Sequence, residues 1–383
     1  MRAGHRRGPG PRAADHQIPP RRAPGGRPGS ARSLTRRSVL AATGVWATRL
    51  LTPAAAGGTL AAAGCAAPRG RPLRARVRVG AYVHLGGSPA RDPVSPGDLE
   101  VLERRLGRRL DICHYFFSWG RPFTEALTAN SDTHTVLLTL ITDAGIVRDV
   151  TAGVHDRYLQ QFASDVRAFG RPVYLRYGHE MNGSWMSYSA GAPGGPTALE
   201  FIASWQHLVG VFRRAGATNA RFVWCPNELD VPDRDGNRLE NYWPGAEWVD
   251  ILGFDAYNWS YRQPRRGTGS WRTFSQVVDS PYQRVTALTG DHPVWLCEFG
   301  TTEAVIPPDP AGVTKGAWFQ DMFATTAFPR LQALVYFSAD DTAVTGRDWR
   351  LDSSTDSLTS FGQGWAAGGG ARSGTDPSTP VRT

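Results

Sequence analysis

The chain of 383 residues contains little cysteine, four residues in all, and this scarcity argues against a disulfide-rich scaffold. Cys113, Cys225 and Cys297 each lie inside an apolar run on a different predicted strand. Three such thiols cannot all pair, so we expect them to be small buried side chains. The ligand spacing of a zinc site and the glycine loop of a phosphate site are also missing. We therefore expect neither a metal nor an organic cofactor.

The chain also lacks a basic surplus beyond its N-terminal segment. The formal net charge is +9, but residues 1–64 contain 11 arginines and one aspartate, which leaves 32 basic and 33 acidic residues in the remainder. Nucleic acid is therefore not an expected partner. No later stretch is long and apolar enough to span a membrane.

The N-terminal segment has the pattern of an export signal. Thr35–Leu40 reads as a twin-arginine motif and is followed by an alanine-rich, moderately apolar stretch, so we interpret residues 1–65 as a signal and 66–75 as a tether. The sequence Ala62-Ala-Gly-Cys65 resembles a lipoprotein cleavage box, which leaves both acylation of Cys65 and simple cleavage open. The protein is then extracellular, or anchored at the outer face of the membrane through Cys65 alone.

Short β-rich runs alternate with helical patterns over residues 76–367, which is typical of a parallel sheet. Helices are predicted at Asp98–Leu106 after the cap Ser95, at Tyr158–Phe169 and at Ala198–Ala215. Eight runs are predicted to be strands: Val77–Val83, Leu110–Phe117, Thr135–Ile141, Val173–Tyr177, Ala220–Cys225, Val249–Phe254, Val294–Cys297 and Leu331–Phe337. This pattern predicts an α/β fold, a single (β/α)8 TIM barrel. Residues 368–383 are predicted to be a disordered tail.

Two glutamates follow strands of this predicted barrel. Glu180 comes after the fourth strand and Glu298 after the seventh, so both belong to the rim where β/α barrels carry their catalytic groups. A pair of carboxyl groups is what glycoside hydrolysis requires, and retention of configuration needs them about 5 to 5.5 Å apart. The sequence therefore predicts a glycosidase with Glu180 and Glu298 as its catalytic residues.

Three motifs extend this interpretation, namely His179–Trp185, Tyr242–Asn258 and Pro293–Gly300. In this order they resemble glycoside hydrolase family 26, which contains β-mannanases and some β-1,3-1,4-glucanases, and the resemblance covers roughly residues 78 to 340. It implies a retaining β/α barrel in which Glu180 is the general acid/base and Glu298 the nucleophile.

The resemblance also implies substrate-binding roles around the two glutamates. Trp185 and Tyr257 are similar to the groups that line the sugar subsite, and His179 and Arg176 accompany the acid/base. Arg176 has the strand parity of Glu180, so we expect it to keep Glu298 ionised, although a plain internal counter-ion is the alternative. Residues that are also expected to bind substrate are Asn182, Trp119 and Trp259.

Three positions carry other expectations. Asn182 also fits a simple turn residue before a glycine. Trp295 is expected in the core behind the barrel wall. For Asn227 and Glu228, which follow the fifth strand, substrate contact and a solvated loop are equally open.

The predicted function is a secreted, monomeric endo-glycosidase that retains configuration and acts on a polysaccharide substrate, β-1,4-mannan or glucomannan first. Mixed-linkage β-glucan and an exopolysaccharide of the producing cell are the alternative substrates. A non-catalytic carbohydrate-binding lipoprotein is the alternative of another class, which the presence of both glutamates disfavours.

Overall fold

The computed structural model describes residues 71–75, 77–84, 96–125, 130–260, 262–263, 267–268, 270–303 and 313–367. The predicted signal with Cys65, the cap Ser95 and the predicted tail lie outside these residues. The chain divides into two units, Met1–Gly64 and Cys65–Thr383, and every described residue belongs to the second.

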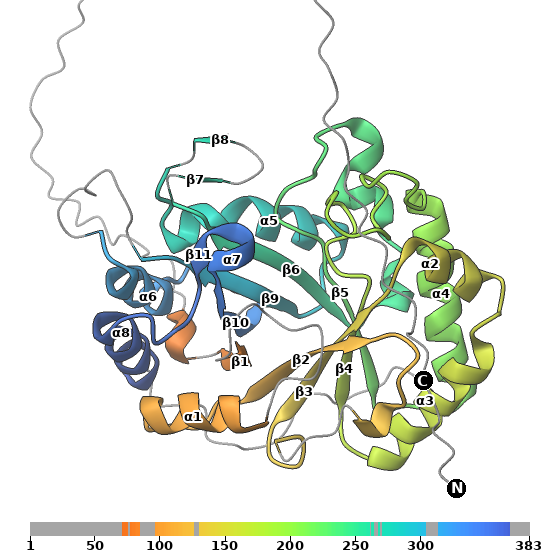
Figure 1. The fold of residues 1–383 in the computed structure, drawn as a ribbon, viewed down its shortest axis with the longest axis horizontal. Helices are drawn as coiled ribbons and strands as arrows, with labels where there is room; N and C mark the ends of the chain where they lie inside the picture. Colours follow the sequence, from red (N-terminus) through yellow and green to blue (C-terminus); the bar gives the residue numbers. More distant parts are fainter. Residues whose placement is uncertain are drawn as a thin grey trace, which may run out of the picture. The chain divides into compact units, whose positions relative to one another are not determined.

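Eight parallel strands form the centre of this unit, and pairing of the first with the last closes them into a barrel (Figure 1). The strands are β1 (Arg78–His84), β2 (Ile112–Ser118), β3 (Thr135–Ile141), β4 (Val173–Tyr177), β5 (Ala220–Trp224), β6 (Ile251–Asn258), β9 (Val294–Thr301) and β10 (Leu331–Asp341). The predicted TIM barrel is therefore confirmed. Short strands also occur, β11 (Arg347–Asp348) antiparallel to β10, and β7 (Arg262–Gln263) paired with β8 (Gly267–Thr268).

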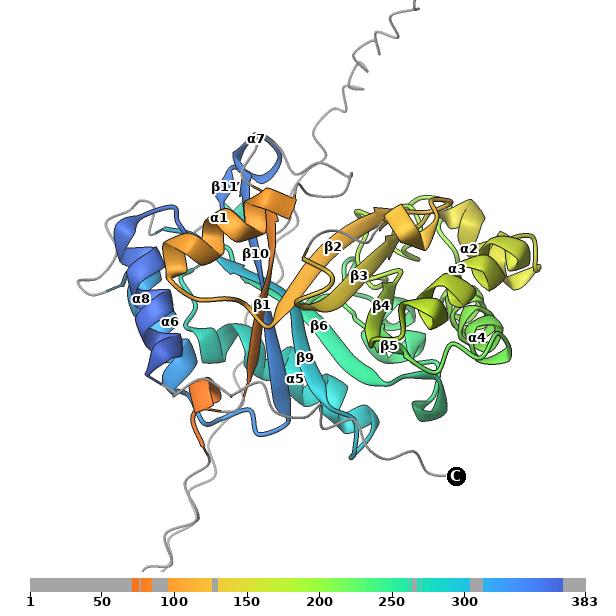
Figure 2. The same cartoon turned by 90° about the horizontal axis from the view of Figure 1, so that it is seen from below.

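Helices surround the strands, and Figure 2 shows α6 and α8 side by side on the outside of the barrel. The helices are α1 (Pro96–Leu106), α2 (Ala144–Thr151), α3 (Asp156–Phe169), α4 (Ala198–Arg214), α5 (Phe274–Leu288), α6 (Lys315–Ala324), α7 (Thr342–Thr345) and α8 (Thr355–Ala366), with short 3-10 turns at Leu73–Ala75, Phe123–Glu125, Asp235–Asn237, Leu239–Tyr242 and Ala246–Trp248. The three predicted helices are present with ends within two residues. Helix α3 ends at Gly170, whose φ of 73° favours glycine.

Three strands run further than the apolar pattern predicts. Strand β6 continues to Asn258, β9 to Thr301 and β10 to Asp341. The extensions contain polar side chains such as Asp255 and Glu298, and an apolar-run criterion stops at such residues. These extra residues carry the polar side chains toward the carboxyl end of the barrel.

The packed domain also begins earlier than expected. Residues 73–75, expected in the tether, form a 3-10 turn in which Leu73 is fully buried, and the Leu73 backbone N–H donates to the Thr325 carbonyl at 3.0 Å. Among the helices within the described residues, none has the length and apolar character needed to cross a membrane.

The apolar core has two parts, one between the strands and the helices and one inside the barrel. Trp295 belongs to the second part, where its ring lies 4.3 Å from that of Tyr174. It is a core residue as expected, but it points into the barrel and not behind its wall. The reason is an irregularity in β9, where Leu296 pairs with Phe254 and Glu298 pairs with the very next residue of β6.

Candidate active site

Glu180 lies three residues beyond the end of β4, in a backbone conformation that residues other than glycine seldom adopt. Its φ is 54°, and holding such a residue in this region costs about 1 to 3 kcal/mol, a strain that clusters at functional sites. The Glu180 backbone N–H donates to the Cys225 carbonyl at 2.8 Å, which ties this turn to the end of β5. The side chain is only 7% exposed, so the turn holds a carboxyl group nearly out of water.

Two donors contact the Glu180 carboxyl group. Asn227 Nδ2 donates to Oε1 at 2.6 Å, and Trp185 Nε1 donates to Oε2. The orientation of the Asn227 amide is fixed because its Oδ1 accepts the backbone N–H of Leu229 at 2.9 Å. Burial, followed by the nearby charge of Glu298, raises the pKa of Glu180 to about 7, although the two donors oppose the rise. A carboxyl group that keeps its proton close to neutral pH is suited to general acid catalysis.

Glu298 points toward the same end of the barrel because β9 contains a bulge. Between Leu296 and Glu298 this strand has one residue more than β6, and the pairing with β10 shifts at the same place. An extra residue of this kind re-aims the side chains that follow it, and such bulges occur next to active sites. Cys297 and Glu298, although adjacent in sequence, therefore both face the barrel interior.

The carboxylate of Glu298 accepts two hydrogen bonds, one on each oxygen. The Tyr257 hydroxyl donates to Oε1 at 2.5 Å, and Arg176 Nη2 donates to Oε2 at 2.8 Å. Glu298 is 8% exposed. Donors on both oxygens stabilise the ionised form, which is the form that a nucleophile requires.

Arg176 lies fully buried at the centre of the barrel and is held from several strands. Its Nη1 donates to both oxygens of Asp255 at 2.8 Å, and its Nε donates to Thr139 Oγ1 at 2.7 Å. Burial disfavours the charge of Arg176, but the carboxylates of Asp255 and Glu298 outweigh it and raise its pKa well above the ordinary value. Arg176 contacts Glu298, and its expected role in keeping Glu298 ionised stays a prediction. Asp255 is a second counter-ion of Arg176, which was not selected from the sequence.

His114 completes the surroundings of Arg176 as a hydrogen-bond acceptor. The Thr139 hydroxyl accepts from Arg176, so its own proton is available to His114 Nε2 at 2.8 Å. Arg176 Nη2 approaches the same nitrogen at 3.3 Å. Burial, and then the charge of Arg176, lowers the pKa of His114 well below its ordinary value. His114 is therefore neutral, with its proton on Nδ1, which has no hydrogen-bond partner among the described residues.

His179 is a second neutral imidazole. The Tyr188 hydroxyl donates to the His179 carbonyl at 2.7 Å, so His179 Nδ1 must be the donor in its 3.1 Å contact with the Tyr188 oxygen. This leaves Nε2 as an acceptor. Burial and the charge of Arg176 lower the pKa of His179 well below its ordinary value.

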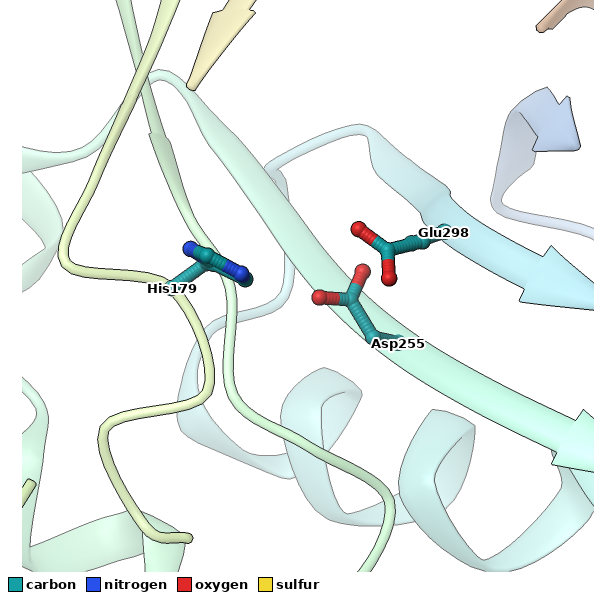
Figure 3. A group of neighbouring side chains, drawn as sticks. All are labelled: His179, Asp255 and Glu298. Atoms are coloured by element: carbon teal, nitrogen blue, oxygen red, sulfur yellow. The ribbon is translucent and has the colours of Figure 1, made fainter. Parts of the chain in front are cut away.

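His179, Asp255 and Glu298 form a group that could hold a cation, since their ligand atoms lie within 4.8 Å of one another (Figure 3). Both carboxylates already bind the guanidinium of Arg176. The positive charge in this cluster is therefore supplied by the protein itself.

Asn182 joins two loops and does not have the substrate contact expected of it. Its side chain is fully buried, its Nδ2 donates to the Asn227 carbonyl at 3.0 Å and to Asp230 Oδ1 at 2.8 Å, and its Oδ1 accepts the Asn227 backbone N–H at 2.8 Å. The amide thus joins the loop after β4 to the loop after β5. This corrects the expectation that Asn182 binds substrate, because no polar atom of the amide is left to face a ligand.

The tryptophans expected to contact substrate are all partly buried. Trp185 lies against Glu180, since its Nε1 donates to the Glu180 carboxyl group. Trp119 Nε1 donates to His155 at 3.5 Å, and Trp259 packs edge-on against Trp349 with ring centres 4.9 Å apart. Substrate contact by Trp119 and Trp259 stays a prediction.

Several residues of the site were not selected from the sequence. Asn227 contacts Glu180 directly, and Glu228 forms an ion pair with Arg272, so neither belongs to a solvated loop. Asp255 lies inside a recognised motif, where its strand parity with Tyr257 is a signal that could have identified it. His114 and Thr139 gave no signal, because polar residues within apolar strands resemble ordinary core positions. The three cysteines are free and buried, as expected.

Chemically, the arrangement places one carboxyl group with a raised pKa and one that accepts two hydrogen bonds at the same end of one barrel. The charge of Glu298 contributes to the raised pKa of Glu180, so the two groups interact. Such a pair can donate a proton to a leaving oxygen while the other carboxylate attacks carbon.

Comparison with known proteins agrees with this geometry. Residues 127–291 match Glycosyl hydrolase family 26. Endoglucanase H of Acetivibrio thermocellus is 29% identical over 302 residues, which are 76% of this chain and 31% of that protein. Beta-1,3-xylanase TXYA of a Vibrio species is 27% identical over 130 residues, which are 34% of this chain and 26% of that protein. The chain thus spans less than a third of the length of these curated relatives.

Solved structures share the fold. A modular endo-β-1,4-mannanase from Cellulomonas fimi superposes with a TM-score of 0.52 at 17% identity, covering 77% of this chain and 71% of that one. The β-mannanase BoMan26A from Bacteroides ovatus gives a TM-score of 0.50 at 16% identity, covering 76% and 88%. The family-model match over residues 127–291 and the barrel with its two carboxyl groups agree, and this chain is similar to glycosyl hydrolase family 26.

Proposed function

We propose that this protein is a retaining glycoside hydrolase that cleaves a β-linked polysaccharide within its chain. The observation that supports this most strongly is the difference in environment between the two carboxyl groups. Glu180 is buried and has a pKa of about 7, whereas Glu298 accepts hydrogen bonds from Tyr257 and Arg176. One group is prepared to give a proton and the other to attack.

The proposed reaction has two steps. In the first, a carboxylate oxygen of Glu298 bonds to the anomeric carbon, the glycosidic C–O bond breaks, and the proton of Glu180 moves to the leaving oxygen. In the second, Glu180 takes a proton from water, the water oxygen bonds to the anomeric carbon, and the bond to Glu298 breaks. The Tyr257 hydroxyl, which donates to Glu298, stabilises the carboxylate charge before the first step and again as this charge returns in the second step.

The backbone of the substrate is proposed to be a β-glucan or a β-mannan. The name of Endoglucanase H, the relative with 29% identity, supports a glucan. The motif resemblance to mannanases supports mannan or glucomannan. Export by the twin-arginine route, acylation of Cys65 and a monomeric state are further proposals, which rest on the sequence alone.

The experiment is release of reducing ends by the purified full chain from mannan, glucomannan, mixed-linkage β-glucan, laminarin and xylan, with Glu298→Ala beside it. We expect cleavage of at least one polymer and none by the variant. Proton NMR of the first product should give the β-anomer, as retention requires. Cleavage by Glu298→Ala at the original rate would refute the mechanism, and silence on all five polymers would favour a specialised exopolysaccharide or carbohydrate binding without catalysis.

A second variant separates the two carboxyl groups. Glu180→Ala should lose about 10² to 10⁴ in rate on the polymer, the contribution of a general acid. It should lose much less on an aryl glycoside such as a 2,4-dinitrophenyl β-glycoside, whose leaving group needs little protonation. Equal losses on both substrates would assign Glu180 a role other than acid catalysis.

A further inference from the structure

Strand β6 extends beyond the neighbour that should pair with its edge. Strand β5 ends at Trp224, and the chain that follows it continues the pairing only as far as Asp255. There the Asp255 backbone N–H donates to the Pro226 carbonyl at 3.0 Å, and the Glu228 backbone N–H donates to the Asp255 carbonyl at 2.8 Å. The next residue of β6 that faces this edge is Tyr257, because alternate residues of a strand present their backbone groups to the same side.

Two side chains take the place of the missing strand at Tyr257. The backbone N–H of Tyr257 donates to Glu228 Oε1 at 3.2 Å, and its carbonyl accepts from Arg272 Nη2 at 2.6 Å. The backbone N–H and C=O of a residue in a sheet need partners, and here a carboxylate and a guanidinium supply them. The ion pair therefore continues the hydrogen-bond ladder of β6 by one residue.

The ion pair is itself rigid. Arg272 Nη1 and Nη2 donate to the two oxygens of Glu228 at 2.9 Å each, a bidentate arrangement that fixes orientation as well as distance. The backbone of Arg272 is also held, since its N–H donates to Asn258 Oδ1 at 3.1 Å and its carbonyl accepts from Trp318 Nε1 at 3.0 Å. The Glu228 side chain is 3% exposed, so water does not compete for it.

Tyr257 is also the residue whose hydroxyl donates to Glu298 at 2.5 Å. We propose that Glu228 and Arg272 are positioning residues for the reaction: they clamp the Tyr257 backbone so that its hydroxyl stays on the nucleophile. The proposal rests on the proposed function, since it assigns Glu298 that role. Neither residue touches the Glu298 carboxylate, so each acts through Tyr257.

The test is a double-mutant cycle with Arg272→Lys, Tyr257→Phe and the double variant. A lysine at 272 keeps a positive charge beside Glu228 and so favours folding, but its ammonium lacks the planar fork that serves Glu228 and the Tyr257 carbonyl together. We expect Tyr257→Phe to lower kcat/KM about 100-fold, as for loss of a donor aimed at developing charge, and Arg272→Lys about 10-fold.

The diagnostic is the double variant. If Arg272 acts through Tyr257, its replacement costs nothing more once the hydroxyl is gone, and the double variant falls about 100-fold and not about 1000-fold. The loss in Arg272→Lys should also fall on kcat, with KM little changed, because the ion pair holds the donor of the nucleophile and does not contact the substrate. Additive losses, or a loss confined to KM, would overturn the proposal and leave a merely structural ion pair.

The controls separate this inference from the proposed function. Arg148→Met breaks a half-exposed ion pair with Glu200 on the outer helices and should leave kcat/KM and its pH profile unchanged. The substrate is whichever of the five polymers the unmodified chain cleaves. If it cleaves none, the proposed function loses its support, and a crystal structure of Arg272→Lys tests the clamp separately. A Tyr257 hydroxyl displaced from Glu298 supports the clamp, and a hydroxyl that keeps its hydrogen bond to Glu298 refutes it.

Discussion

The hydrogen bond from Asn227 to Glu180 gives a prediction that can be worked out in magnitude. Asn227 Nδ2 donates to Glu180 Oε1 at 2.6 Å and favours the ionised form, against burial and the charge of Glu298. A hydrogen bond to a charged group is worth about 1.5 to 3 kcal/mol, and about 1.4 kcal/mol corresponds to a tenfold change in the protonation equilibrium. Replacement by alanine therefore raises the pKa of Glu180 from about 7 to about 8 or 9.

The sign of the effect on activity follows from the role of the acid. Glu180 must hold its proton in the first step, so activity falls as pH rises through its pKa. A higher pKa moves the basic limb of kcat/KM upward, and Asn227→Ala should retain activity at a pH where the unmodified enzyme has lost it, even if its maximum is lower.

The assay is initial rates of reducing-end release between pH 4 and 10, fitted for the basic limb. Asn227→Asp is the informative companion, because it keeps an oxygen for the Leu229 N–H and places a second negative charge beside Glu180. The basic limb of Asn227→Asp should shift to higher pH by at least as much as that of Asn227→Ala. A limb that stays in place or moves downward in both variants would refute the assignment of Glu180 as the acid or of Asn227 as its donor.

Three further predictions concern stability. The folded pKa of Glu180 is raised to about 7, so its contribution to stability is present below about pH 4.5 and is lost as pH rises through 7. In urea unfolding, Glu180→Gln should therefore gain about 3 kcal/mol of stability relative to the unmodified chain between pH 4.5 and 8. The absence of this gain would contradict the raised pKa. Burial lowers the pKa of Lys315 to about 8, so between pH 8 and 10.5 only the unfolded lysine still binds a proton. Over this range the free energy of unfolding of the unmodified chain should rise by about 3 kcal/mol relative to that of Lys315→Met. Parallel pH dependences of the two unfolding free energies would count against this. A methyl group on Gly253 would lie 2.9 Å from both Cys225 Cβ and Cys297 Sγ, so Gly253→Ala should lose about 1 to 3 kcal/mol by overpacking, whereas Gly236→Ala, with open space around it, is its control.

The order of the elements and the catalytic pair could be predicted from the sequence because both depend on local patterns. Apolar runs of strand length alternate with helical periodicity, and parallel strands joined by helices bring all their carboxyl ends to one rim. Glu298 follows such a run directly and Glu180 lies three residues after one, so their meeting is a consequence of the topology and needs no knowledge of packing.

Tertiary structure decided what surrounds these two residues. The bulge in β9 that turns Glu298 inward leaves no mark in the apolar pattern, and it also reversed the expected direction of Trp295. The roles of Asn182 and Asn227 depend on which loop each amide reaches. Hydrogen bonds between residues far apart in the chain form only when the barrel closes. Local sequence therefore determined which groups carry the chemistry, and long-range packing determined the pKa of Glu180 and the orientation of both side chains.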